Sequence, residues 1–249
     1  MENHIHLDCI SSTSTYLKEM VEKCPPEKRQ ELFPSYFVVT ASRQEQGKGR
    51  QQKTWESEPD KNLLFSILLY PQINPSQQFD VCRQVSVAIA EFVKETFSIE
   101  NVSIKWPNDI YVNDKKLVGI LIEHFINGDT INYSIAGIGI NINQILFPAA
   151  LPNPTSIYLE TKKNHSLEFS LEKVMDKIKQ VVERPVWLLE KQYMDYLYKY
   201  NVYSNYLLPK ISQQPFSLKI IGINEMGLLQ LEDKNGQLFC CAFNEIIYC

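Results

Sequence analysis

Residues 103–123 have the sequence SIKWPNDIYVNDKKLVGILIE, in which two apolar stretches flank a polar pair. The stretches at residues 110–112 and 117–123 are rich in β-branched and apolar side chains, and Asn113-Asp114 lies between them. This pattern predicts two short strands joined by a tight turn. Because Pro107 favours an extended conformation for the residue before it, we expect a fixed elbow at the entrance to the hairpin.

Lysines stand at the ends of these apolar stretches. Lys105 ends one stretch and Lys116 begins another, with Asn108 and Asp109 between them. An ammonium group is costly to bury without a partner, so strand interiors usually exclude it. Two interpretations follow: the lysines converge on a bound anion, or they protect the exposed edge of a solvated hairpin.

Length and composition are those of an ordinary globular protein. The chain has 249 residues, of which 44% are hydrophobic and 22% charged, enough for one large or two smaller domains. Its net charge of −4 argues against a dedicated nucleic-acid binder, which needs a basic surface to displace counterions. The N-terminus does not resemble a signal peptide, and no apolar run approaches the ~20 residues of a membrane span. We therefore expect a cytoplasmic protein that contacts neither nucleic acid nor membrane.

The six cysteines show no metal-binding or redox spacing. No two of them are separated by two residues, and the four histidines do not cluster. This distribution argues against a zinc site or a thioredoxin-like motif. Reduced thiols in the cytoplasm are the simplest interpretation.

A polar segment at residues 41–55, ASRQEQGKGRQQKTW, combines glycines with cations. Gly47 and Gly49 permit close backbone approach, and four basic residues stand against one glutamate. Such a segment can offer N–H groups and cations to a polyanion, and Trp55 at its end can stack on a base. It is not a P-loop, because the sequence contains no Gly-x-x-x-x-Gly-Lys-Ser/Thr, and it is not a dinucleotide fingerprint, because Gln52 occupies the third glycine position. A mobile surface connection is the alternative.

Two further motifs suggest ligand contact. The run SSTST at residues 11–15 precedes a helical pattern, and Ser12 or Ser14 is expected to cap that helix. The other hydroxyls either share the cap or face a ligand. The sequence AGIGIN at residues 136–141 places glycines at alternate positions of a strand. Alternate glycines leave one sheet face bare, either for a ligand or for a closely packed helix.

The remaining hydrophobic patterns predict an α+β chain. Strands are expected at residues 5–10, 36–40, 63–69 and 131–142, and helices at residues 17–24, 77–97, 171–182 and 187–200. After about residue 213 the pattern changes to short strands at 216–223, 228–232 and 238–243. This C-terminal segment predicts a small β-barrel docked on the main domain.

In order and spacing, these motifs resemble those of the biotin–protein ligases. The match consists of the hydroxyl run, the GKGR loop ending at Trp55, KWPND at residues 105–109, KLVG at 116–119 and GIGIN at 137–141. The resemblance spans nearly the whole chain. It implies a mixed β-sheet backed by helices, as in class II aminoacyl-tRNA synthetases, with a small C-terminal SH3-like barrel. The implied domains are a catalytic domain at residues 1–205 and the barrel at residues 206–249. Because the catalytic pattern begins within the first dozen residues, the implied type lacks the N-terminal DNA-binding domain of the repressor members.

The resemblance implies a two-step reaction that uses ATP and Mg²⁺, with biotin as substrate. The carboxylate of biotin attacks the α-phosphate of ATP to give biotinyl-5′-AMP. A lysine of a biotin carboxyl carrier protein then displaces AMP. Joining a carboxylate to a triphosphate needs cations more than a base, which agrees with the residue types. A monomer and a homodimer are both compatible with this activity.

The resemblance also assigns roles position by position. Lys116 and Arg50 would be the catalytic cations. The implied biotin-binding residues are Ser12, Thr13, Ser14, Gln44, Lys48, Gly49, Arg50, Lys116, Gly119 and Gly137. The implied residues for ATP and the adenylate are Trp55, Lys105, Asn108, Asp109, Gly139 and Asn141. Asp109 is in addition a candidate Mg²⁺ ligand.

Three residues depart from the family pattern, and two other functions are open. Lys48 stands where arginine is frequent, Gln52 where glycine is frequent and Ser14 where asparagine is common. The segment at residues 43–55 is expected to order when ligand binds. The alternatives are a lipoate–protein ligase, with a longer apolar tunnel, and a non-catalytic biotin-binding sensor or adaptor.

Overall fold

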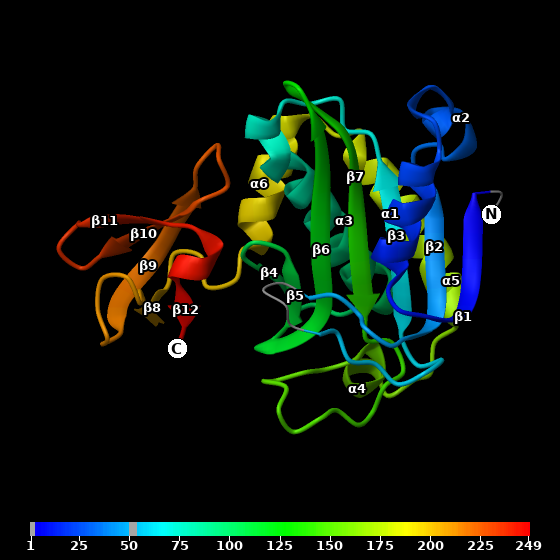
Figure 1. Ribbon diagram of the computed structural model, residues 1–249. Helices are drawn as coiled ribbons and strands as arrows, with labels where there is room; N and C mark the ends of the chain where they lie inside the picture. Colours follow the sequence, from blue (N-terminus) through cyan, green and yellow to red (C-terminus); the bar gives the residue numbers. More distant parts are fainter. Residues whose placement is uncertain (1–2, 50–53) are drawn as a thin grey trace.

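A mixed β-sheet forms the centre of the computed structural model, which describes residues 3–49 and 54–249 (Figure 1). Within these residues the sheet has seven strands, in the order β1-β2-β3-β7-β6-β5-β4. Their bounds are β1 His4–Ile10, β2 Val38–Gln44, β3 Leu63–Leu69, β7 Thr130–Ile140, β6 Lys115–Asn127, β5 Asp109–Val112 and β4 Val102–Lys105. β1 pairs with β2 in parallel and the other pairs are antiparallel, which confirms the predicted mixed sheet.

Helices cover both faces of this sheet. The helix α1 (Thr13–Lys23) packs on one face, and the helices α3 (Gln78–Phe97), α5 (Leu167–Val182) and α6 (Val186–Tyr196) lie behind the other (Figure 1). Two short helices, α2 (Arg29–Leu32) and α4 (Ile157–Thr161), lie in connections. All seven residues of β3 are buried, because helices cover both of its faces.

The alternation of side chains along β7 explains where the site lies. Tyr133 and Ile135 pack against α1, whereas Ile138 and Ile140 belong to the core on the α3 side. Because side chains alternate between faces, Gly137 lies on the α1 side with Ile135, and Gly139 follows it there. The start of α1 reaches Gly137, where a Cβ atom would meet the Ser14 hydroxyl. Gly139 therefore lies just beyond the part of the sheet that α1 covers.

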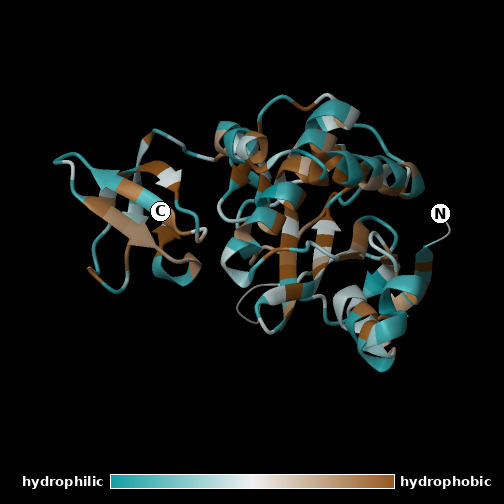
Figure 2. Ribbon diagram, turned by 90° about the horizontal axis from the view of Figure 1, so that it is seen from above, coloured by the Kyte–Doolittle hydropathy of each residue, from teal (hydrophilic) through white to brown (hydrophobic). Residues whose placement is uncertain are grey.

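A second, antiparallel sheet follows the main one (Figure 2). Its strands, in the order β11-β10-β9-β8-β12, are Leu238–Cys241, Leu229–Asp233, Phe216–Ile223, Tyr203–Leu207 and Ile247–Tyr248. Trp106 joins the two sheets, because its Nε1 donates to the Gly227 carbonyl at 3.0 Å and its ring lies 6.0 Å from that of Phe243. The predicted division between residues 205 and 206 stays a prediction; β8 spans that position.

The structure corrects several element bounds. The predicted loop at 41–55 begins after Gln44, because β1 holds the chain in parallel register as far as the pair Ile10–Gln44. The last predicted helix ends at Tyr196 instead of residue 200, since the Tyr198 N–H donates to the Ile104 carbonyl. The short elements β8, β12, α2 and α4 were not predicted, because each is too short to show a hydrophobic period.

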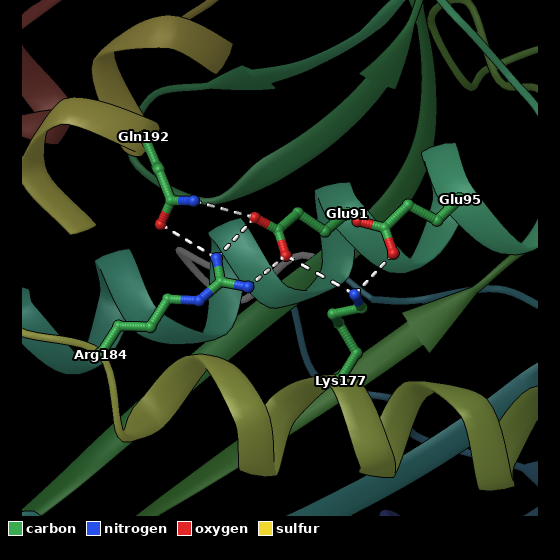
Figure 3. A network of polar contacts seen from close by, with 5 residues as sticks. All are labelled: Glu91, Glu95, Lys177, Arg184 and Gln192. Atoms are coloured by element: carbon green, nitrogen blue, oxygen red, sulfur yellow. Dashed lines mark hydrogen bonds and ion pairs between the residues drawn. The ribbon is translucent and has the colours of Figure 1, made fainter. Parts of the chain in front are cut away.

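A partly buried network of ion pairs and hydrogen bonds fixes the three helices behind the sheet to one another (Figure 3). Arg184 donates to both carboxylate oxygens of Glu91, at 2.6 and 2.9 Å. Gln192 accepts from Arg184 through its Oε1 and donates to Glu91 through its Nε2. Lys177 lies 2.6 Å from Glu95 and 3.7 Å from Glu91. The hydrogen bond to Glu91 raises the pKa of Arg184. The network joins α3, α5 and α6 where Pro185 separates the last two helices.

Glu91→Ala is expected to lower the free energy of unfolding by about 2–3 kcal/mol, because it removes both carboxylate acceptors of a largely buried guanidinium and leaves it only Gln192. Glu95→Ala is the matched control, since its carboxylate is 58% exposed and a loss of at most about 0.5 kcal/mol is expected. Urea unfolding monitored by circular dichroism measures both values. Equal losses in the two variants would contradict this account of the network.

In the described ranges, no helix is long and apolar enough to cross a bilayer.

Candidate active site

A cavity of about 840 Å³ opens between the main sheet, the start of α1 and the second sheet. Among the described residues, every predicted site residue lines this cavity except Asn108. The lining residues predicted from sequence are Ser12, Thr13, Ser14, Gln44, Lys48, Gly49, Trp55, Lys105, Asp109, Lys116, Gly119, Gly137, Gly139 and Asn141. The predicted catalytic Arg50, together with Gln52, lies outside the described residues. Segments far apart in the sequence thus line the same cavity.

The two lysines lie on strands β4 and β6, on either side of β5, and both line this cavity. Lys105 ends β4 and Lys116 lies near the start of β6. Lys116 Nζ is 2.6 Å from Asp109 Oδ2, and both side chains are about one third exposed. Lys105 Nζ lies 3.2 Å from the Tyr111 hydroxyl. The strand β5 carries Asp109 and Tyr111 and therefore gives each lysine a partner.

The elbow at residues 105–109 is fixed from behind the sheet. The peptide bond between Trp106 and Pro107 is cis. The Pro107 carbonyl accepts from the Tyr193 hydroxyl at 2.6 Å and from Cys82 Sγ at 3.1 Å. Asn108 is 1% exposed, and neither its Nδ2 nor its Oδ1 has a partner among the described residues. The helices α3 and α6 therefore set the position of the segment that carries Lys105 and Asp109.

The hydroxyl run forms a polar end to the cavity. Thr13 Oγ1 lies 2.8 Å from Ser66 Oγ and 3.1 Å from Gln44 Oε1, and Ser14 Oγ lies 2.8 Å from Ser66 Oγ. Ser12 is the N-cap residue of α1, which confirms the predicted position, but its side chain makes no cap hydrogen bond. The Thr13 N–H donates instead to Gln44 Oε1, at 2.8 Å. Gln44 takes the place of a cap and joins α1 to β2.

Two glycines form a flat floor under Trp55. Gly119 and Gly139 are direct neighbours across β6 and β7. A Cβ atom at Gly139 would lie 2.5 Å from Trp55 Cε2, and one at Gly119 would lie 2.6 Å from Cζ3. The sequence predicted a bare face for a ligand or for a closely packed helix, whereas in the structure the Trp55 indole lies on this part of it. Trp55 therefore lies on this floor and lines the cavity, with its ring centroid 5.9 Å from Lys116 Nζ.

The ends of the glycine-rich loop are paired with each other. Lys48 forms an isolated bridge with Thr54, and the Trp55 N–H donates to the Gly47 carbonyl at 2.8 Å. These contacts return the chain to the sheet and set Trp55 on its floor. The expected ordering of the loop on ligand binding stays a prediction.

Four lining residues have a buried polar atom without a partner in the described part of the chain. The atoms are Ser12 Oγ, Trp55 Nε1, Asn141 Oδ1 and the Tyr248 hydroxyl. Buried polar groups are nearly always hydrogen-bonded in native proteins. Their presence around one cavity is typical of a site in which a bound molecule supplies the partners.

The sequence did not reveal several lining or supporting residues. Ser66 is the one polar residue in the apolar strand LLFSILL, and this exception could have indicated a residue of the site. Tyr111 lies two residues after Asp109 on the same strand face, so the KWPND motif pointed to it. Tyr248 on β12 and Phe243, in the turn before that strand, line the cavity from the C-terminal part of the chain, and no sequence pattern placed them there. Burial and the nearby Asp109 raise the pKa of Tyr111 to about 12, which keeps its hydroxyl neutral.

The structure also bears on the predicted metal ion. Among residues 3–49 and 54–249, no three His, Cys, Asp or Glu side chains gather as metal ligands. Mg²⁺ usually binds one or two carboxylates and completes its shell with substrate phosphates and water. Asp109, in the cavity wall and about one third exposed, fits this mode.

Comparisons with known proteins agree on one family. A family model described as "Biotin/lipoate A/B protein ligase family" matches residues 7–141. The bifunctional ligase/repressor BirA of Bacillus subtilis is 29% identical over 245 residues, covering 93% of this chain and 70% of that protein. A human biotin–protein ligase is 29% identical over 223 residues, covering 81% of this chain and 29% of that protein.

Solved structures are similar over the whole chain. The biotin protein ligase from Aquifex aeolicus, in complex with biotin and ATP, has a TM-score of 0.76 and 25% identity and is covered completely in both chains. The biotin protein ligase from Leishmania major, in complex with biotinyl-5-AMP, shares the fold with a TM-score of 0.66 and 22% identity. That match covers 97% of this chain and 99% of the other.

Proposed function

Because the chain belongs to the biotin/lipoate A/B protein ligase family, we propose that it is an ATP-dependent biotin–protein ligase. In the first step a biotin carboxylate oxygen bonds to the α-phosphorus of ATP, and the bond to the β-phosphate oxygen breaks. Pyrophosphate leaves with the electron pair, and biotinyl-5′-AMP is formed. In the second step a lysine amine of a carrier domain attacks the acyl carbon, and AMP leaves as the amine loses a proton.

One observation carries the proposal: two lysines, a polar end and a tryptophan on a glycine floor meet at a single cavity. Its volume of about 840 Å³ is within the range that small-molecule sites occupy. Carboxylate and triphosphate repel each other, so the first step needs fixed positive charge where they meet. Lys116, in the cavity wall between Asp109 and Trp55, is suited to the reacting carboxylate and α-phosphate.

The two ends of the cavity suit the two substrates. We assign the ureido ring of biotin to the polar end built by Ser12, Thr13 and Gln44, where hydroxyl and amide groups can match its N–H and C=O. We assign ATP to the end that contains Trp55 and Lys105. Mg²⁺ on the ATP phosphates would be held by Asp109 and would neutralise part of the triphosphate charge.

In this assignment Asp109 has two alternative partners, the Lys116 ammonium and Mg²⁺. In the structure Asp109 neutralises Lys116 at 2.6 Å. If Asp109 held Mg²⁺, the Lys116 ammonium would be available to the reacting anions. Both side chains are about one third exposed, so the pair is not buried and can separate at modest cost.

Incubation with ATP, Mg²⁺, biotin and a biotin carboxyl carrier domain tests the function. We expect the carrier to gain the mass of one biotinyl group on a lysine, read by mass spectrometry. Replacing biotin by lipoate separates the lipoate ligase alternative, because a lipoyl adduct in its place would support that activity. A protein that binds biotin but modifies no carrier and releases no pyrophosphate would instead be the non-catalytic sensor.

A further inference from the structure

Lys105 is held between two tyrosine rings that come from different sheets. Its Nζ lies 5.0 Å from the ring centroid of Tyr111 on β5 and 4.6 Å from that of Tyr248 on β12. An ammonium within about 6 Å of an aromatic face is attracted by the ring quadrupole. The strand β12 belongs to the second sheet, so residues 143 positions apart in the sequence meet at the cavity wall (Figure 1).

The ring of Tyr248, and not its hydroxyl, makes this contact. The Tyr248 hydroxyl is buried and has no partner among the described residues. Burial raises its pKa, so the phenol is neutral at physiological pH. Tyr206 meets the ring edge-on at 5.1 Å and Tyr198 stacks on it at 6.3 Å, which fixes the ring plane.

We propose that Tyr248 is a positioning residue of the adenylation site, which fixes the Lys105 ammonium against the phosphates of ATP. This inference rests on the proposed function. A lysine side chain has several rotatable bonds, and ordering it at the moment of binding costs conformational entropy. A ring that already restrains the ammonium lowers that cost. The second sheet is therefore part of the ATP-binding wall.

The test compares two replacements of Tyr248 in steady-state pyrophosphate release. Tyr248→Leu removes the ring, and we expect the KM for MgATP to rise about 5- to 30-fold with the KM for biotin unchanged. Tyr248→Phe keeps the ring and loses only the unpartnered hydroxyl, so it should restore a KM for MgATP within about twofold of the natural value. Tyr203→Leu is the matched control, because Tyr203 carries Lys219 and Lys234 over its ring in the same sheet but does not line the cavity.

A double-mutant cycle protects the test from folding defects. In a Lys105→Met background, Tyr248→Leu should raise the KM for MgATP no further, because the ammonium is already gone. The inference would be overturned if Tyr248→Phe and Tyr248→Leu raised the KM for MgATP equally. It would also be overturned if Tyr248→Leu raised this KM as much in the Lys105→Met background as in the natural protein. An unchanged KM for MgATP in Tyr248→Leu would overturn it as well. Failure of the proposed function would differ from all of these, because the natural protein itself would release no pyrophosphate.

Discussion

Lys116→Ala is expected to lower the rate of biotinyl-5′-AMP formation by about 10²- to 10³-fold, the usual effect of removing one fixed donor from developing charge. The dissociation constant of biotin should change by no more than about threefold, because the ureido ring is assigned to the opposite, polar end of the cavity. The reason is local: Lys116 Nζ lies in the wall between Asp109 and Trp55, where the two acids have to meet. Single-turnover pyrophosphate release and calorimetric biotin binding measure the two quantities.

Lys115→Ala is the matched control for this variant. Lys115 precedes Lys116 on β6 but is exposed and does not line the cavity. Both variants lose one positive charge from the same strand, so a general electrostatic effect would appear in both. A Lys116→Ala protein that forms the adenylate at the natural rate would remove the role proposed for this residue.

Gly139→Ala is expected to raise the KM for ATP by about 10- to 100-fold, the size of one lost base–aromatic stack. The added methyl would lie 2.5 Å from Trp55 Cε2 and 2.6 Å from Nε1, so the indole has to leave its floor. Biotin binding should be little affected, since the polar end is set by Gln44 and Ser66. Steady-state pyrophosphate release at varied ATP and biotin separates the two constants.

A cycle with Trp55→Ala shows whether the glycine acts through the indole. The single variants should raise the KM for ATP alike, and the double variant should add nothing further. Gly222→Ala on β9 is the control, because its Cβ atom meets only the flexible side chain of Gln230, at 3.0 Å. Additive effects of Gly139→Ala and Trp55→Ala would contradict the view that the floor serves Trp55.

Much of the main sheet and one half of the site could be predicted from local sequence. The strand β3 follows directly from the continuous apolar run LLFSILL. The KWPND and KLVG motifs alone predicted that Lys105 and Lys116 lie at one site. These features depend on residues that are near one another along the chain. The comparisons confirm the family that the motifs indicated.

The features that the sequence did not reveal depend on long-range packing. Tyr248 reaches the cavity because Trp106 and Gly227 dock the second sheet on the first, and nothing local to Tyr248 encodes that contact. Ser12 is the predicted N-cap residue, but the side-chain bond at this helix start comes instead from Gln44, 31 positions from Thr13, whose N–H it accepts. The glycine floor was recognised, but its occupant, Trp55, lies more than 60 residues before Gly119.

Pyrophosphate release in the absence of any carrier protein tests most directly whether positive side chains join two acids in this cavity. On mixing with MgATP and biotin, the protein is expected to release a burst of about one pyrophosphate per active site and then turn over slowly, because the enclosed anhydride is held until a lysine accepts it. The burst should vanish without biotin. Release that is the same with and without biotin, or no release at all, would contradict the account.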